Sequence, residues 1–348
     1  MSERIAIFGA GAVGAYVGGY LTHAGRDVTL IDPWKVHVEK MNTEGLVLSG
    51  LTEPENFTVK PRAILVDDLK GGAPFDIIFI CTKSFNTENA AKTMKPYIAE
   101  PNGFMVSLQN SINEPTIASV VGEARTIGCI ASQISVSMWE PGAVRRNVAL
   151  GGDKHVVFRV GELDGRVTDR VKHVSEILSD IDSSKVTETL MGERWSKLCV
   201  NCMRNPVSGA SGLATNDCDR NDHIRGLAIR IAAEAVAVAT AEGHPLEKIS
   251  GISPELLLRA GQGDADAFKQ CEDIMIAGIA RRSDAQRPSM AQDIGKGMRT
   301  EIDYINGTVV EAGKKHGIPT PANAAIVFAV KKVEAKEAEP SPDLVMGI

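Results

Sequence analysis

The sequence contains no run of about 18 consecutive apolar residues, the length that a membrane-spanning helix requires. It has no basic block either, since its 38 lysines and arginines are interspersed with 44 acidic residues. This pattern favours neither a nucleic acid nor an anionic membrane as partner. The six cysteines lie at scattered spacings, which argues against a disulfide scaffold. Because the first predicted strand starts almost at the N-terminus, we expect no signal peptide and a cytoplasmic protein.

Two of the cysteines, Cys199 and Cys202, have a C-x-x-C spacing that is compatible with metal or redox chemistry. The sequence has no second pair of this kind and no two histidines at ligand spacing. The pair also lies inside a helical pattern. We therefore interpret both residues as small buried thiols and expect no metal site.

A glycine-rich motif near the N-terminus carries the first functional signal. It consists of Gly9, Ala10, Gly11, Ala12, Val13 and Gly14. The apolar run Ile5–Phe8 precedes it, an amphipathic helix ending at Gly25 follows, and a second strand, Val28–Ile31, leads to the acidic Asp32. In this context the glycines allow a tight turn, and the N-terminus of the helix binds a pyrophosphate. The motif therefore predicts a dinucleotide-binding site.

The length of 348 residues favours two domains. Strands and helices alternate up to about residue 135, which predicts an α/β fold with a Rossmann-type doubly wound parallel sheet in an N-terminal domain of residues 1–187. Residues 188–336 show helical patterning, which predicts an all-helical C-terminal domain. Two prolines in residues 337–348 indicate a loose tail.

Two more local expectations concern single elements. The extended runs Val144–Leu150 and His155–Gly161 predict an antiparallel hairpin that extends the sheet. The segment Ser289–His316 predicts one helix. Its last turn is basic, and Gly317 and Pro319 follow it, which is a typical signal for the C-terminal end of a helix.

Lys197, Asn201 and Asn205 recur at i, i+4 and i+8, so a helix would place them on one stripe about 12 Å long. An ammonium can protonate an oxygen that gains negative charge, and asparagines can orient a carboxylate and a carbonyl. A solvated polar face with a capping asparagine is the alternative. Pro206 removes the N–H that would pair with the carbonyl of Cys202, so we expect the helix to bend or end there.

A third polar group lies further along the chain. Ser289 could bind a ligand, but with Gln292 it also matches a capping box. Glu301 borders an apolar row and is either an ordinary rim carboxylate or a partner for Lys197.

Three features together resemble the ketopantoate reductase (2-dehydropantoate 2-reductase) family. They are the glycine fingerprint, W-x-K-L-x-x-N-x-x-x-N-P from Trp195, and P-S-M-x-Q-D-I followed by T-E-I-D-Y-I-N-G. The resemblance runs over about residues 3–335. It implies a nicotinamide-dependent enzyme of pantothenate biosynthesis that reduces a small 2-oxo acid.

The resemblance also implies roles for residues at matching positions. Lys197 is the general acid, and Glu301 lies beside the cofactor and the lysine. Asn201 and Asn205 anchor the substrate, and Ser289 donates to its carboxylate. Asn110 lies near nicotinamide and substrate, and Lys83, after the fourth strand of the family's sheet, lies near the cofactor.

Two departures from the family pattern matter. Ser111 stands where the family usually has glycine, so a side chain there alters the backbone or fills space near the substrate. Asp32 would accept hydrogen bonds from ribose hydroxyls and repel a 2′-phosphate, which favours NAD over NADP. Lys35 could still reach a phosphate. Alternatively, Asp32 with Pro33 forms a helix N-cap, and both roles are compatible.

These observations predict an oxidoreductase that transfers a hydride between a nicotinamide cofactor and a 2-oxo or 2-hydroxy acid. An NAD-dependent dehydrogenase of another hydroxy acid or secondary alcohol is one alternative. A non-catalytic dinucleotide-binding sensor is another. The apolar helices of the second domain leave a homodimer open, without indicating which face is shared.

Overall fold

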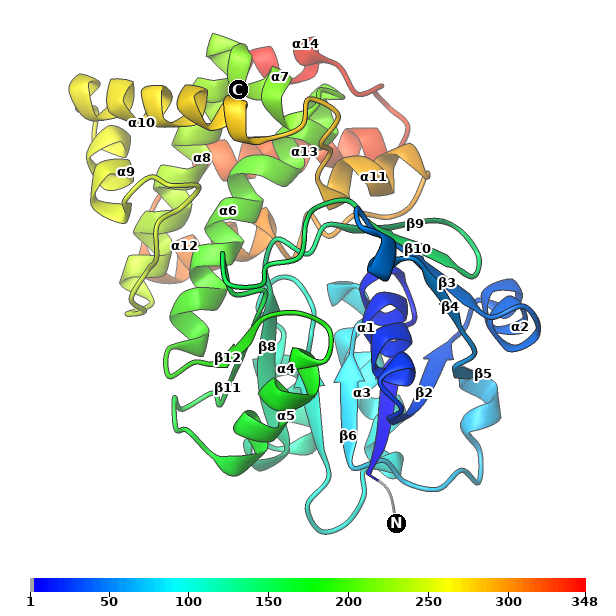
Figure 1. The fold of residues 1–348 in the computed structure, drawn as a ribbon. Coiled ribbons are helices and arrows are strands. Elements are labelled where there is room, and N and C mark those ends of the chain that lie inside the picture. Colours follow the sequence, from blue (N-terminus) through cyan, green and yellow to red (C-terminus); the bar gives the residue numbers. More distant parts are fainter. Residues whose placement is uncertain (1–2) are drawn as a thin grey trace. The chain divides into compact units, whose positions relative to one another are not determined.

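The computed structural model describes residues 3–348, and the chain forms two compact units, Met1–Leu190 and Met191–Ile348. The first unit is built on an eight-stranded sheet (Figure 1). In spatial order its strands are β12 (Ser184–Val186), β11 (Phe158–Gly161), β8 (Thr126–Ala131), β7 (Phe104–Ser107), β6 (Ile77–Ile80), β1 (Arg4–Phe8), β2 (Asp27–Asp32) and β5 (Arg62–Leu65). Neighbouring strands are parallel, except that β11 runs antiparallel to β8. The predicted Rossmann-type sheet is confirmed.

Alternate residues of the central strand β1 enter two different cores, as the two-residue repeat of a strand requires. Ile5 and Ile7 pack with α1 (Ala12–His23) and α5 (Asp169–Ser179). Ala6 and Phe8 pack on the other face with α3 (Thr87–Met94) and α4 (Glu114–Val121). Short 3₁₀ helices complete the connections: η1 (Glu53–Glu55), η2 (Val66–Leu69), η3 (Ser84–Asn86), η4 (Lys95–Tyr97) and η5 (Glu123–Arg125).

The strand order reverses at β1. From β1 the chain passes to β2 and β5 on one side, and later through β6, β7 and β8 on the other. In open α/β sheets, ligands bind outside the carboxyl ends of the strands at such a reversal. The topology therefore places the ligand site of this unit at the carboxyl ends of β1, β2, β6 and β7.

A smaller sheet lies against α1. Its strands, in spatial order, are β4 (Phe57–Val59), β3 (Leu46–Ser49), β10 (Ala143–Arg146) and β9 (Val136–Glu140). A Cβ at Gly19 of α1 would lie 2.8 Å from Leu48 Cδ1, so the small residue permits this close approach. Gly142 lies in the turn between β9 and β10.

The predicted hairpin over 144–161 is wrong, because its two strands belong to different sheets. β10 pairs with β3 and β9, whereas β11 pairs with β8 and β12. The carboxylate of Asp182 accepts the backbone N–H groups of Gly151 and Gly152 and forms a buried ion pair with Arg146 at 2.7 Å. These contacts hold the two glycines in a crossing between sheets rather than in a hairpin turn.

The second unit consists of helices and loops, as predicted (Figure 1). Its helices are α6 (Leu190–Ser211), α7 (Thr215–Arg220), α8 (Asp222–Ala241), α9 (Pro254–Gly261), α10 (Ala265–Gly278), η6 (Ile279–Arg281), α11 (Ser289–Gly295), α12 (Asn306–His316), α13 (Pro321–Glu334) and α14 (Pro342–Met346). The apolar helix α8 is central and contacts α9, α10, α12, α13 and α14. Among residues 3–348, no helix combines the length and apolarity needed to cross a membrane.

Two expectations for this unit are wrong. The segment 289–316 forms two helices, since Gly297 adopts a φ of 65° and interrupts the pattern between α11 and α12. The tail is not loose over 341–347. The Ser341 N–H donates to the carbonyl of Ala210, and Val345 of α14 is buried, so apolar burial orders this segment.

Candidate active site

The glycine-rich loop joins β1 to α1, and its three glycines meet different requirements. Gly9 has a φ of 96°, and a Cβ at Gly14 would lie 2.1 Å from the carbonyl oxygen of Gly9. The packing of the protein itself therefore requires both glycines. A Cβ at Gly11, in contrast, would meet no described atom within 4 Å. This open space lies at the N-cap of α1, whose first turn holds Ala12 and Val13, so the loop fits the pyrophosphate of a dinucleotide.

Asp32 is the last residue of β2, next to this loop. One of its carboxylate oxygens accepts the N–H of Trp34 at 2.9 Å. Helix α2 (Lys35–Thr43) starts after Trp34, which occupies the N-cap position, so the alternative interpretation of Asp32 as the cap is wrong. The other carboxylate oxygen makes no hydrogen bond within residues 3–348. It is therefore available to a ribose hydroxyl.

His37 of α2 supports the glycine-rich loop, a role that the sequence did not indicate. Its Nδ1 accepts the N–H of Gly142 at 2.9 Å, so its proton resides on Nε2, which lies 2.9 Å from the carbonyl oxygen of Ala10. Burial lowers the pKa of His37, against a smaller opposing effect of Asp32. A neutral imidazole thus joins the loop to the smaller sheet.

Lys83 and Asn110 follow the neighbouring strands β6 and β7. Ile80 lies opposite Ser107 in the sheet register, so both chains leave the sheet at the same edge. Both site residues are partly exposed. The structure therefore brings Lys83 and Asn110 to the edge that also carries the glycine-rich loop and Asp32.

A hydrogen-bond network fixes the loop that carries Asn110. The side-chain amide of Gln109 donates to the carbonyl of Thr82 and to the hydroxyl of Thr87, each at 2.8 Å. The amide of Asn113 donates to the carbonyl of Asn110 at 2.5 Å, and Thr87 donates to Asn113 at 2.9 Å. The backbone of Asn110 is therefore held, while its own side chain makes no hydrogen bond within residues 3–348.

In the second unit, α6 carries Lys197, Asn201 and Asn205 along one stripe, as the spacing predicted. Lys197 and Asn201 are partly exposed, and Asn205 is 6% exposed. The Nδ2 of Asn201 is buried and has no hydrogen-bond partner within residues 3–348. A buried donor without a partner costs free energy, which a bound ligand can recover.

The two cysteines on the same helix are buried thiols, as interpreted from the sequence. Cys199 and Cys202 are free and fully buried. Burial raises the pKa of the Cys199 thiol to about 12 and that of Cys202 well above its usual value. Both remain protonated at neutral pH and act as apolar packing residues.

Helix α6 does not end at Pro206 but continues to Ser211. The carbonyl oxygen of Cys202, which lacks its usual helical partner, instead accepts the side-chain N–H of Asn306 at 3.2 Å. Asn306 is fully buried and also donates to Asn323 at 3.0 Å. It is the second residue whose role the sequence did not indicate, although it lies within the T-E-I-D-Y-I-N-G motif.

Ser289 and Glu301 lie at the start of α11 and after its end, respectively. Ser289 is the first residue of α11, and the capping box is not formed, since the amide of Gln292 donates to the carbonyl of Arg287. Glu301 is 5% exposed, in the turn before α12. Helix α11 packs on α6, because a Cβ at Gly209 would lie 3.0 Å from Ile294.

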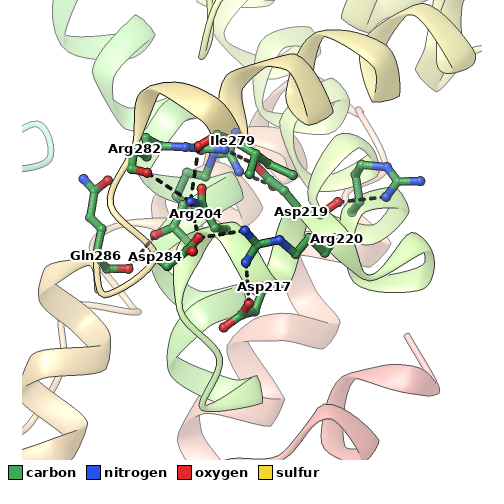
Figure 2. Close-up of polar contacts among 11 residues, drawn as sticks. Arg204, Asp217, Asp219, Arg220, Ile279, Arg282, Asp284 and Gln286 are labelled. Atoms are coloured by element: carbon green, nitrogen blue, oxygen red, sulfur yellow. Dashed lines mark hydrogen bonds and ion pairs between the residues drawn. The ribbon is translucent and has the colours of Figure 1, made fainter.

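A buried ion cluster holds the segment that leads to Ser289 (Figure 2). Arg204 of α6 and Arg282 both donate to the carboxylate of Asp219 in α7, which is 1% exposed. Nearby, Asp284 accepts hydrogen bonds at 2.8 Å from two other side chains of α7. The carboxylate of Asp219 therefore ties both α6 and the segment that leads to α11 to α7. These contacts fix the positions of the three segments relative to one another.

The comparisons with known proteins agree with this geometry. Residues 5–158 match the family model "Ketopantoate reductase PanE/ApbA", and residues 189–334 match its C-terminal counterpart. A 2-dehydropantoate 2-reductase of Pyrococcus horikoshii is 31% identical over 95% of this chain and 98% of its own length.

Solved structures extend the likeness to three dimensions. A PanE/ApbA family ketopantoate reductase from Ralstonia eutropha JMP134 is 29% identical, with a TM-score of 0.77 over 96% of this chain and 99% of its own. D-mandelate dehydrogenase, solved with NADH and anilino(oxo)acetate, shares the fold at 22% identity, with a TM-score of 0.78 over 96% of this chain and 98% of its own. With both units matched, the chain belongs to the ketopantoate reductase family.

Proposed function

We propose that this protein is a nicotinamide-dependent oxidoreductase that interconverts a 2-oxo acid and the corresponding 2-hydroxy acid, with 2-dehydropantoate as the first candidate substrate. Family membership supports the reaction class. The observation that carries the proposal is the stripe of α6, where an amine, Lys197, shares one helix face with the buried, unsatisfied amide of Asn201. A sensor that only binds a dinucleotide has no use for such a stripe.

The first unit holds the cofactor. Gly9, Gly11 and Gly14 form the turn that leaves room for the pyrophosphate at the N-terminus of α1. Asp32 accepts hydrogen bonds from the adenosine ribose and repels a 2′-phosphate, so NAD is preferred to NADP. Lys83 lies near the cofactor. When bound, the nicotinamide supplies the hydride for the carbonyl carbon of the substrate.

The second unit supplies the proton and the substrate contacts. Lys197 donates a proton to the substrate oxygen, and its ammonium stabilises the negative charge that develops there. Asn201 and Asn205 orient the substrate, and Ser289 donates to its carboxylate. Glu301 acts beside Lys197 and the cofactor, and Asn110 of the first unit contacts nicotinamide and substrate. Orientation of this kind makes the reaction effectively intramolecular.

Asp32 also favours a second candidate, an NAD-dependent dehydrogenase of another 2-hydroxy acid. NAD in cells is mainly oxidised, so preference for it is typical of enzymes that oxidise their substrate. Both candidates use the same residues and differ in substrate and direction. A homodimer is compatible with either candidate function. Light scattering of the purified protein would measure its oligomeric state.

The deciding experiment is an activity matrix on the purified chain. Its rows are 2-dehydropantoate and a panel of other 2-oxo acids, and its columns are NADH and NADPH, with the reverse reaction measured on the hydroxy acids. The proposal expects turnover of 2-dehydropantoate, faster with NADH. Turnover of other acids alone would favour the second candidate. Cofactor binding without any turnover would refute both candidate enzymes and favour the non-catalytic dinucleotide-binding sensor.

A further inference from the structure

Ser111 occupies a position at which the backbone is costly for any residue other than glycine. It follows Asn110 in the loop from β7 to α4 and has a φ of 65°. This left-handed conformation brings a Cβ close to the backbone and is uncommon for a serine. Glycine would adopt it without cost.

The hydroxyl of Ser111 carries a second cost. The residue is 5% exposed, and its Oγ is buried without a hydrogen-bond partner within residues 3–348. Nearly all buried polar groups in folded proteins are paired, so an unpaired hydroxyl calls for a specific reason. Neither the backbone nor the side chain of Ser111 therefore stabilises the unliganded fold.

The surrounding loop does not relax to remove these costs. Gln109 and Asn113, on either side of Ser111, are tied to Thr82, Thr87 and the carbonyl of Asn110. These hydrogen bonds hold the chain and keep the serine in the left-handed region. Strain that a rigid frame maintains at the ligand-binding edge of a sheet is typical of functional residues.

The strand order indicates which ligand groups can reach the hydroxyl of Ser111. Asp32, on the adenosine side, ends β2, whereas Ser111 follows β7 on the other side of the strand reversal. The loop after β7 therefore serves the nicotinamide end of the site. The groups that bind there and accept a hydrogen bond are the carboxamide oxygen of nicotinamide and the oxygens of a 2-oxo acid.

We infer that Ser111 is a ligand-binding residue whose hydroxyl donates a hydrogen bond to a carbonyl or carboxylate oxygen at the nicotinamide end of the site. The inference rests on the proposed function for the identity of the ligand. It adds a donor to those of Asn110, Asn201 and Asn205, and it gives a reason for serine at a position suited to glycine.

Two variants separate the hydroxyl from the backbone. Ser111→Gly removes both the strain and the hydroxyl, and Ser111→Ala removes the hydroxyl but keeps a Cβ at positive φ. We expect Ser111→Gly to raise the Tm and both variants to lower affinity or kcat/KM about tenfold, the effect of one lost hydrogen bond. A residue with a purely structural role would not lose function while it gains stability.

The matched control is Ser250→Gly, because Ser250 is a second serine at positive φ, with a φ of 52°, in the Ile249–Ile252 turn of the helical unit. We expect a higher Tm and unchanged kcat/KM. For each protein, the Kd for NADH and the kcat/KM for the 2-oxo acid are measured. A change confined to the Kd assigns the hydroxyl to the nicotinamide, and a change confined to kcat/KM assigns it to the substrate.

If both constants stay within about twofold of wild type in both Ser111 variants, the inference is overturned. Absence of turnover in the wild-type protein would refute the proposed function instead. The Kd for NADH would then decide the role of Ser111 by itself, so the two failures are distinguishable.

Discussion

The side chain of Asn306 replaces the backbone donor that Pro206 removes from α6. Proline has no N–H, so the carbonyl of Cys202 lacks its helical partner. The Nδ2 of Asn306 lies 3.2 Å from this oxygen. The substitute bond lets α6 pass through Pro206 and connects the helix of Lys197 and Asn205 to the start of α12.

We therefore expect Asn306→Ala to destabilise the protein by about 1–3 kcal/mol, because it leaves a buried carbonyl unpaired. The measurement is the midpoint of urea unfolding. Pro206→Ala restores an N–H at position 206 that can reach Cys202. The double variant should then be more stable than the sum of the single effects predicts. If the two effects on stability simply add, the side chain of Asn306 does not replace the backbone donor that is missing at Pro206.

Lys197→Ala should lower kcat at least about a hundredfold, since the substrate oxygen loses its proton donor. The Kd for NADH should change little, because the residues proposed to bind the cofactor are predominantly those of the first unit. Stopped-flow turnover and fluorescence titration measure the two quantities. The control is Lys248→Ala, at an exposed lysine of the same unit. Near-normal turnover in the Lys197 variant would remove this lysine from the mechanism.

Asp32→Asn should shift the ratio of kcat/KM values for NADPH and NADH about tenfold toward NADPH, because the charge that repels a 2′-phosphate is lost. Asparagine retains an oxygen that can accept the N–H of Trp34, so the local turn is preserved. Asp27→Asn, at the exposed start of the same strand, is the control and should leave the ratio unchanged. An unchanged ratio in the Asp32 variant would refute the role in cofactor choice.

Acid should weaken the fold and the cofactor site through His37. Burial holds the pKa of His37 below its ordinary value of 6.5, so the unfolded chain binds this proton more readily than the folded one. The contribution of His37 to stability is complete above about pH 6.5 and is lost as the pH falls toward the folded pKa. Protonation also converts Nδ1 into a donor, which can no longer accept the N–H of Gly142.

The test compares wild type with His37→Gln, whose amide can still donate to Ala10 but does not titrate. The loss of Tm and of NADH affinity between about pH 7.5 and pH 5.5 should be smaller in the variant. Equal losses in both proteins would assign the pH dependence to other groups.

Local patterns in the sequence determined the parts of this protein that depend on neighbours in the chain. The strand, glycine turn and helix over 4–23 follow from spacing alone, as does the shared stripe of Lys197, Asn201 and Asn205. The two-residue and 3.6-residue repeats are properties of a single strand or helix, so the sequence displays them directly.

Only the tertiary structure decided the contacts between distant segments. His37 meets Gly142 across 105 positions, and Asn306 meets Cys202 across 104. The two strands predicted as one hairpin joined different sheets, because Asp182 holds Gly151 and Gly152 in a crossing. Residue spacing does not identify such partners, since closing a long loop costs nearly the same free energy for many pairings. Burial and hydrogen bonding in the folded chain select the one that forms.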